Sequence, residues 1–85
     1  MALIGDVKQL LSAAFPGAEV HLKRFRPGNR IGGSVVWNGF DGQMQIDRQV
    51  RLRDVIDSEL PAEQRTQVSF IMTLTPDEEA ILAAD

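Results

Sequence analysis

The spacing of apolar residues changes repeatedly along this chain of 85 residues, and each change limits the fold. From about Leu3 to Phe15, apolar residues recur every three or four positions, which predicts an amphipathic helix. From Ala18 to Trp37 they alternate with polar or small residues, which predicts two strands. Between these strands lies the turn sequence Arg26-Pro27-Gly28-Asn29-Arg30, so the pair is predicted to be a β-hairpin.

In the second half, helical spacing returns after the glycine turns Asn38-Gly39 and Asp41-Gly42. Pro61 ends this helix and can begin a short helical turn up to Arg65, because proline is tolerated at a first helical position. Trp37 is predicted to anchor the core beside Phe40, the alternative being an exposed interface patch. The apolar residues of the central helix are Ile46, Val50, Leu52, Val55, Ile56 and Leu60.

The last strand and the last helix are separated by a clear boundary. Residues 68–74 are apolar at most positions, so we expect an inner strand with Phe70 and Met72 in the core. Thr75 and Glu78 have the spacing of a capping box, with Pro76 at the first helical position. A final helix from Pro76 to about Ala84 is therefore predicted.

The predicted element order is α-β-β-α-(α)-β-α in one domain, residues 1–85. A small sheet offers one face to helices that each carry one apolar stripe, so the expected class is α+β, a two-layer sandwich. A right-handed crossover through the central helices returns the third strand parallel to the second. The three-stranded sheet is therefore expected to be mixed.

Composition excludes several kinds of chemistry. The chain has no cysteine and one histidine, which removes disulfides, thiolate nucleophiles and cysteine-ligated metals. The start of the chain lacks a basic segment followed by an unbroken apolar run, and no stretch approaches the roughly 20 apolar residues that span a membrane. These features predict a cytoplasmic protein without a membrane segment.

A set of residues in the second half of the chain forms a recognisable pattern: Phe40, Gly42, Arg48, Leu52, Leu60 and the run Thr73-Leu74-Thr75-Pro76 with Glu78. This pattern, in the predicted element order, resembles the BolA family, whose fold is like that of the type II KH domain. The resemblance implies a mostly non-enzymatic protein that works with monothiol glutaredoxins in iron-sulfur cluster handling, or that binds nucleic acid and regulates transcription.

The chain departs from the BolA pattern at the positions that matter for metal binding. Where that family usually carries histidine, after the helix arginine and at the start of the last strand, this chain has Gln49 and Gln67. The loop from Phe25 to Arg30 offers neither histidine nor cysteine. Because iron-sulfur clusters need such ligands, we expect no cluster, no metal and no other cofactor.

No catalytic constellation is visible in the sequence. His21 has no cysteine or second histidine to share a metal, and its outward place on a strand predicts a surface residue. Asp54 and Asp57 have the spacing of a solvated helix face, and no serine has a nucleophile-elbow setting. Gly32-Gly33 lacks the features of a phosphate-binding loop and predicts a strand bulge or tight packing. An enzyme is not expected.

The most suggestive cluster surrounds the hairpin, where cations flank one aromatic residue. Cations contact phosphates or acidic groups, and an aromatic ring can stack on a base. Residues 21–53 carry seven cationic residues and two carboxylates, whereas residues 54–85 carry one cationic residue and eight carboxylates. This charge asymmetry can steer a partner toward one face, or the charges can simply keep two surfaces solvated. The candidate binding residues are Lys23, Arg24, Phe25, Arg26 and Arg30, joined by Arg48 and Arg51 if the fold brings the two groups together.

Two functional hypotheses follow. The first is a non-enzymatic BolA-like adaptor or regulatory protein that binds a macromolecule, in the first place another protein, through these residues. The alternative is a KH-like nucleic-acid-binding protein that uses the same hairpin. The absence of a GXXG loop between the central helices, where Ser58 to Glu63 contains no glycine, counts against RNA. The sequence leaves the oligomeric state and the identity of the partner open.

Overall fold

The computed structural model describes residues 3–26, 28 and 30–83, and it confirms the predicted α+β class and element order. Pro27 and Asn29 of the predicted turn, and Ala84 of the last predicted helix, lie outside the described residues. No helix in the described part of the chain is both long and apolar enough to cross a membrane. The elements are α1 (Leu3–Ala14), β1 (Glu19–Phe25), β2 (Arg30–Val36), the 3₁₀ helix η1 (Asn38–Phe40), α2 (Gln45–Glu59), α3 (Ala62–Arg65), β3 (Val68–Leu74) and α4 (Pro76–Ala83).

The three strands form a mixed sheet in the order β1-β2-β3. β1 and β2 are the antiparallel arms of the hairpin, and β3 returns parallel to β2, as predicted. The prediction that β3 is an inner strand is wrong, because β2 is the central strand and β3 forms one edge. Through the hairpin, β1 pairs with one edge of β2. After the crossover through α2 and α3, β3 can therefore pair only with the other edge of β2.

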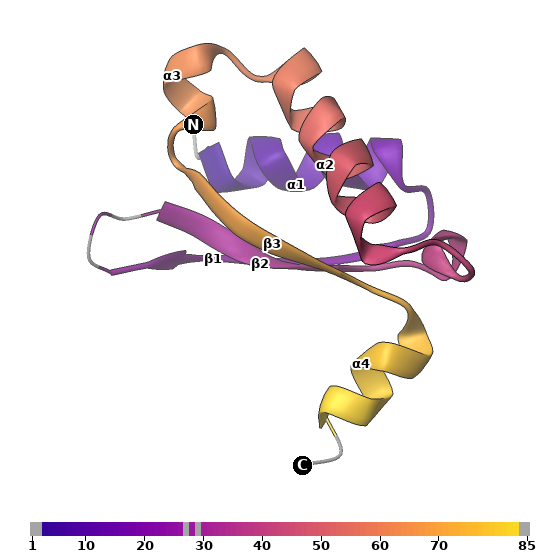
Figure 1. Cartoon of the computed structure of the whole chain (residues 1–85). Coiled ribbons are helices and arrows are strands. Elements are labelled where there is room, and N and C mark those ends of the chain that lie inside the picture. The colour runs from indigo at the N-terminus through magenta and orange to yellow at the C-terminus, as the bar shows by residue number, and fades with distance from the viewer. Residues whose placement is uncertain (1–2, 27, 29, 84–85) are drawn as a thin grey trace.

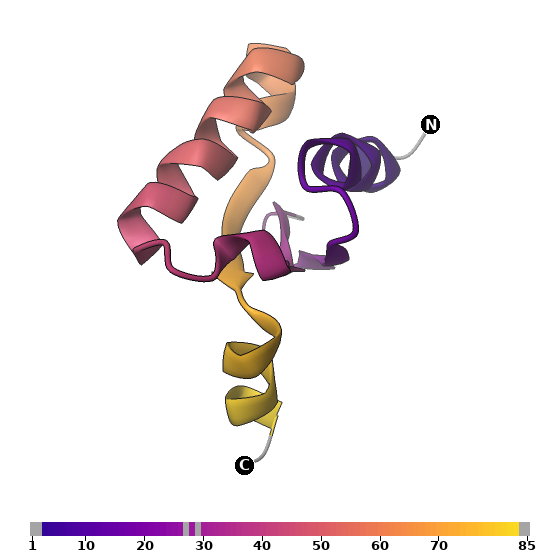
Figure 2. The ribbon, with the colours of Figure 1, turned by 90° about the vertical axis from the view of Figure 1, so that its right-hand side faces the viewer.

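The helices are divided unequally between the two faces of the sheet (Figure 1). α1 and α2 pack on one face, and α4 lies beyond the opposite face, as the view turned by 90° also shows (Figure 2). The main core lies between the sheet and the first two helices. Its buried residues are Val7, Leu11, Phe15, Val20, Ile31, Val35, Phe40, Leu52, Ile56, Leu60 and Ile71.

The sheet face opposite this core is largely uncovered, and we call it the open face. Ile31 and Val35 of β2 are core residues, so the alternate positions of that strand point to the open face. On β3, Phe70 and Met72 are 66% and 39% exposed, which corrects the prediction that both lie in the core. Their neighbour Ile71 is buried and fills the core position instead.

Within the described part of the chain, two strand residues outside the main core are buried at one end of the open face. Val36 and Leu74 are paired in register and buried, although neither belongs to the main core cluster. α4 follows β3 directly and contacts it, so this helix lies at the end of the open face where these two residues sit (Figure 1).

Trp37 and Phe40 close one end of the core, as predicted for Trp37. Their ring centroids lie 5.2 Å apart, and Trp37 lies at the same distance from Phe15. The indole Nε1 of Trp37 donates a hydrogen bond of 2.8 Å to the carbonyl of Pro16. The tryptophan therefore joins the end of α1 to the end of the hairpin.

α2 differs in detail from the predicted central helix. It begins at Gln45, three residues after Gly42, and η1 lies just before the Asp41-Gly42 turn. Ile46 and Val50 are exposed, so they do not belong to the buried stripe. That stripe consists of Arg48, Leu52 and Ile56, spaced four residues apart.

Candidate functional site

The predicted basic cluster forms the turn end of the hairpin. Phe25 and Arg30 are register partners at the last rung of the β1–β2 ladder, and Arg26 follows directly. These side chains, with those of Lys23 and Arg24, are exposed. The five hairpin residues that the sequence singled out therefore lie at the same end of the hairpin, with Lys23 and Phe25 on one side of β1 and Arg24 on the other.

Phe25 is the aromatic centre of this cluster and lies across the central strand. Its side chain is so close to Gly32 that a Cβ on that glycine would lie 2.8 Å from the ring. The ring remains 44% exposed, and the Nζ of Lys23 lies 5.6 Å from its centroid. An exposed ring near a cation can contact either an apolar group or a nucleobase.

The open face extends this surface with apolar side chains. The backbone of Phe70 lies beside Gly32, the residue under the Phe25 ring. Phe70 and Met72 are both exposed, and Met72 is paired in register with Ser34 of the central strand. β3 thus adds exposed apolar residues next to the end of the hairpin that carries the cations.

Arg48 is buried, so the structure does not place it in the exposed basic cluster with the hairpin residues that the sequence predicted. Only 4% of this residue is exposed, and its guanidinium donates to the carbonyls of Gln43 (3.0 Å) and Thr73 (3.3 Å). It also forms a two-bond ion pair with the carboxylate of Glu78, at 2.7 and 3.3 Å. Its place in the stripe with Leu52 and Ile56 is the sequence signal that could have indicated burial.

Arg51 is exposed but lies far from the hairpin cluster. Its guanidinium carbon is 5.4 Å from the ring centroid of Phe15 and 5.5 Å from that of Trp37. Phe15 precedes β1 and Trp37 follows β2, so this arginine is at the end of the sheet away from the hairpin turn. Since β2 has seven residues and spans about 20 Å, the fold does not join the two predicted basic groups.

Glu78 of α4 pairs with Arg48 of α2 and also caps the N-terminus of α4. Its carboxylate accepts a hydrogen bond of 2.9 Å from the backbone N–H of Thr75, whose hydroxyl accepts one of 3.2 Å from the N–H of Glu78. This is the predicted capping box. The Arg48 hydrogen bonds, then the Thr75 N–H, hold the pKa of Glu78 below its usual range.

Gln49 has a structural contact at the edge of the sheet. Its Nε2 donates to the carbonyl of Ile71 (3.0 Å) and to the hydroxyl of Thr73 (3.3 Å). The carbonyl of Thr73 in turn accepts a hydrogen bond of 2.9 Å from Nε2 of Gln45. Gln67 contributes a backbone carbonyl to the sheet, accepting the N–H of Ile31 at 2.7 Å. Both glutamine positions are thus used in holding β3.

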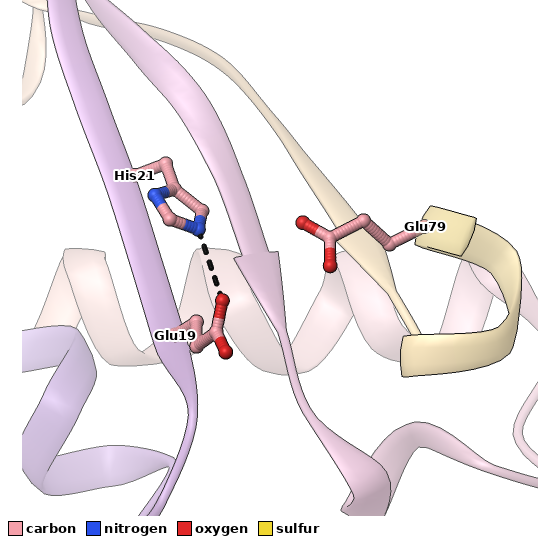
Figure 3. A group of neighbouring side chains, drawn as sticks. All are labelled: Glu19, His21 and Glu79. Atoms are coloured by element: carbon pink, nitrogen blue, oxygen red, sulfur yellow. Dashed lines mark hydrogen bonds and ion pairs between the residues drawn. The ribbon is translucent and has the colours of Figure 1, made fainter. Parts of the chain in front are cut away.

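His21 is an exposed residue on β1, as predicted, and it points to the open face. Its Nε2 lies 3.3 Å from an oxygen of Glu19 (Figure 3). The carboxylate of Glu79, from α4, lies close to both side chains. Sequence reasoning missed Glu79 because no pattern in the chain indicates that α4 comes next to β1.

A groove lies on the other side of β3, between that strand, α2 and α3. Its volume is about 400 Å³, and Gln49, Arg53 and Phe70 contribute to its walls. Asp57 in this groove lies 3.9 Å from the guanidinium of Arg65. The one histidine of the chain, His21, lies on the open face. The Asp57 carboxylate in the groove therefore has no histidine beside it with which to form an acid-base pair.

The chain was compared with known protein families and with curated proteins. No family matched, and no curated protein matched.

Proposed function

We propose that this chain is a small non-catalytic adaptor that binds another protein through the hairpin cluster and the adjoining open face. The observation that carries the proposal is the exposed Phe25, whose ring has the Lys23 ammonium 5.6 Å from its centroid and lies over Gly32, next to the backbone of Phe70. Contiguous exposed apolar side chains are characteristic of interaction surfaces, and aromatic residues with arginine are enriched where such interfaces are buried. Acidic groups on the partner would complement the hairpin cations.

The resemblance to the BolA family supports the same kind of function. Its implication of a non-enzymatic protein agrees with a surface that offers contacts rather than acid-base chemistry. Gln49, at a position where that family carries histidine, is occupied by hydrogen bonds to β3. We therefore propose that this adaptor acts without ligating an iron-sulfur cluster of its own.

The test compares matched variants of the immobilised chain in quantitative affinity capture. Phe25→Ala removes the aromatic centre, and Arg30→Glu reverses one exposed charge beside it. Arg53→Glu makes the same charge reversal on the exposed side of α2 and serves as the control. Proteins captured by the wild type and by Arg53→Glu should be lost from both hairpin variants. Equal capture by all four forms would contradict the proposal.

A second candidate, single-stranded nucleic acid, is favoured by one specific observation. The Phe25 ring is exposed and lies 5.6 Å from the Lys23 ammonium, an arrangement suited to stacking a base beside a phosphate contact. Fluorescence anisotropy with mixed-sequence RNA and DNA strands tests it across a salt series. The logarithm of the affinity should fall against the logarithm of the salt concentration, with a slope of about −0.7 for each phosphate neutralised. Phe25→Ala should weaken binding further at every salt concentration. No binding at low salt would remove this candidate.

A further inference from the structure

Three metal-ligating side chains from distant parts of the chain meet on the open face. Glu19 and His21 are two residues apart on β1, so both project from the same side of the strand. Glu79 comes from the first turn of α4. One ligand atom from each of the three lies within 4.8 Å of the other two, and Figure 3 shows the Glu79 carboxylate directed toward the strand that carries the other two.

We propose that Glu19, His21 and Glu79 bind a divalent first-row transition metal, for which zinc is the appropriate probe. The donor set is one imidazole nitrogen and two carboxylate oxygens. Zinc takes both kinds of ligand, whereas magnesium and calcium prefer oxygen alone. With three protein ligands, one coordination position stays open to water or to a group from outside.

One pair of ligand atoms in the cluster already has the separation that a tetrahedral ion needs. Bonds of about 2.0–2.2 Å to zinc place neighbouring ligand atoms about 3.4 Å apart. His21 Nε2 and Glu19 Oε1 are already 3.3 Å apart. Glu79 completes the triangle from the end of a long, partly exposed side chain, which can rotate toward the ion without moving the backbone.

Charge favours a cation at the same place. With a neutral imidazole, the cluster carries two negative charges within a few ångströms, and like charges so close repel. A divalent ion neutralises both carboxylates. The exposed position of Glu19 and His21 gives it a direct path from solvent.

The metal would have a structural effect on α4. This helix buries none of its described residues, and Ile81 and Leu82 are 72% and 54% exposed. Among the described residues, its hydrogen-bonded and ionic anchors lie in or next to its first turn: the capping box and the Arg48–Glu78 ion pair. A metal that joins Glu79 to β1 would add an attachment across the sheet and fix the direction in which Ile81 and Leu82 point.

Zinc titration of the untagged, chelator-treated chain tests this proposal, by calorimetry and by the visible absorption of the cobalt complex. Because the chain has one histidine and no cysteine, His21 supplies its only side-chain nitrogen or sulfur ligand of the usual zinc type. We expect one equivalent of zinc to bind with micromolar affinity, without competition from magnesium or calcium. His21→Ala and Glu79→Gln should weaken binding roughly tenfold or more. Glu59→Gln, an exposed change at the end of α2, should leave it unchanged.

Amide hydrogen exchange supplies a second readout. Zinc should slow exchange in α4 of the wild type and leave it unaltered in Glu79→Gln. Circular dichroism verifies that each variant is folded, as expected because neither His21 nor Glu79 is a core residue. The proposal is overturned by any of three results: no binding at submillimolar protein, wild-type affinity in His21→Ala, or wild-type affinity and exchange in Glu79→Gln.

Discussion

Arg48 is the residue at which the helical layer, the sheet and the last helix meet. Its stem lies in the buried stripe of α2, and its guanidinium reaches the carbonyl of Thr73 at the end of β3 and the carboxylate of Glu78 on α4. A buried charge is tolerated only when it is paired and hydrogen-bonded. Arg48 meets this requirement with groups from three segments, so it couples the position of α4 to that of the core.

The Glu78 partner makes this coupling sensitive to acid. The pKa of Glu78 is lowered in the folded chain, chiefly by its hydrogen bonds with Arg48. The unfolded chain therefore takes up this proton more readily. The stability contributed by the ion pair is fully present above the unfolded-state pKa and is lost as the pH falls through the lower folded-state pKa.

Urea unfolding at a series of pH values tests this expectation. Glu78→Gln should lower the urea midpoint at neutral pH and should flatten its fall under acidic conditions, below the usual pKa range of glutamate. Glu63→Gln, an exposed change on α3, is the control and should keep the wild-type profile. Identical profiles for Glu78→Gln and the wild type would show that the ion pair contributes nothing to stability.

Among the elements, β2 has a strict local requirement at its glycine pair. Its register with β3 shifts between Ile31 and Gly33, which is the bulge or tight packing expected of the glycine pair. Gly33 has a φ of 152°, and a Cβ there would collide with the carbonyl of His21 on β1. The central strand therefore depends on a residue without a side chain.

The same chemical change at two glycines should have opposite effects. Gly33→Ala should destabilise the fold by about 1–3 kcal/mol, since it forces strain on the backbone and separates β1 from β2. Gly5→Ala lies within α1 and has open space around its Cβ, so it should stabilise the chain by about 0.5–1 kcal/mol. Urea midpoints of the two variants provide the measurement. A Gly33→Ala variant as stable as the wild type would mean that the strand relaxes without cost.

Local sequence patterns predicted the elements well, but not their neighbours. The capping box from Thr75 to Glu78 and the alternation around Val20 depend on residues close together in the chain, so they could be recognised directly. Phe70 and Met72 could not be placed, because a strand that is apolar on both faces fits either an inner strand or an edge strand with one open face. The approach of Glu79 to His21 is tertiary, since their sequence positions are far apart.

For the molecule as a whole, the main consequence of the fold is its one-sided burial. α1 and α2 cover one face of the sheet (Figure 2), while on the other face Val36 and Leu74 are buried and the described residues Phe25, Phe70 and Met72 are exposed. Folding therefore leaves the remaining apolar residues of that face in water. Such a surface contributes little to folding and remains available for binding.

Two adjacent residues of β3 distinguish the faces by experiment. Ile71→Ala should cost about 2–5 kcal/mol because it leaves a cavity in the core. Phe70→Ala should change the free energy of unfolding by no more than about 0.5 kcal/mol, since most of its side chain is already exposed. Denaturation curves compare the two. A large loss in Phe70→Ala would indicate that the open face is covered, for example by a second copy of the chain.

The contacts between α2 and β3 also limit how the sheet can grow. The carbonyls of Ile71 and Thr73 already accept side-chain hydrogen bonds from Gln45, Arg48 and Gln49, so an incoming strand would have to displace these donors. β1 is the edge without this protection by α2. Two copies that joined through their β1 edges would produce a six-stranded sheet with β3 at each end. Because side chains of α2 occupy carbonyls of each β3, association of this kind stops at a pair. A sheet whose two edge strands both had free hydrogen-bonding groups could extend into a fibre.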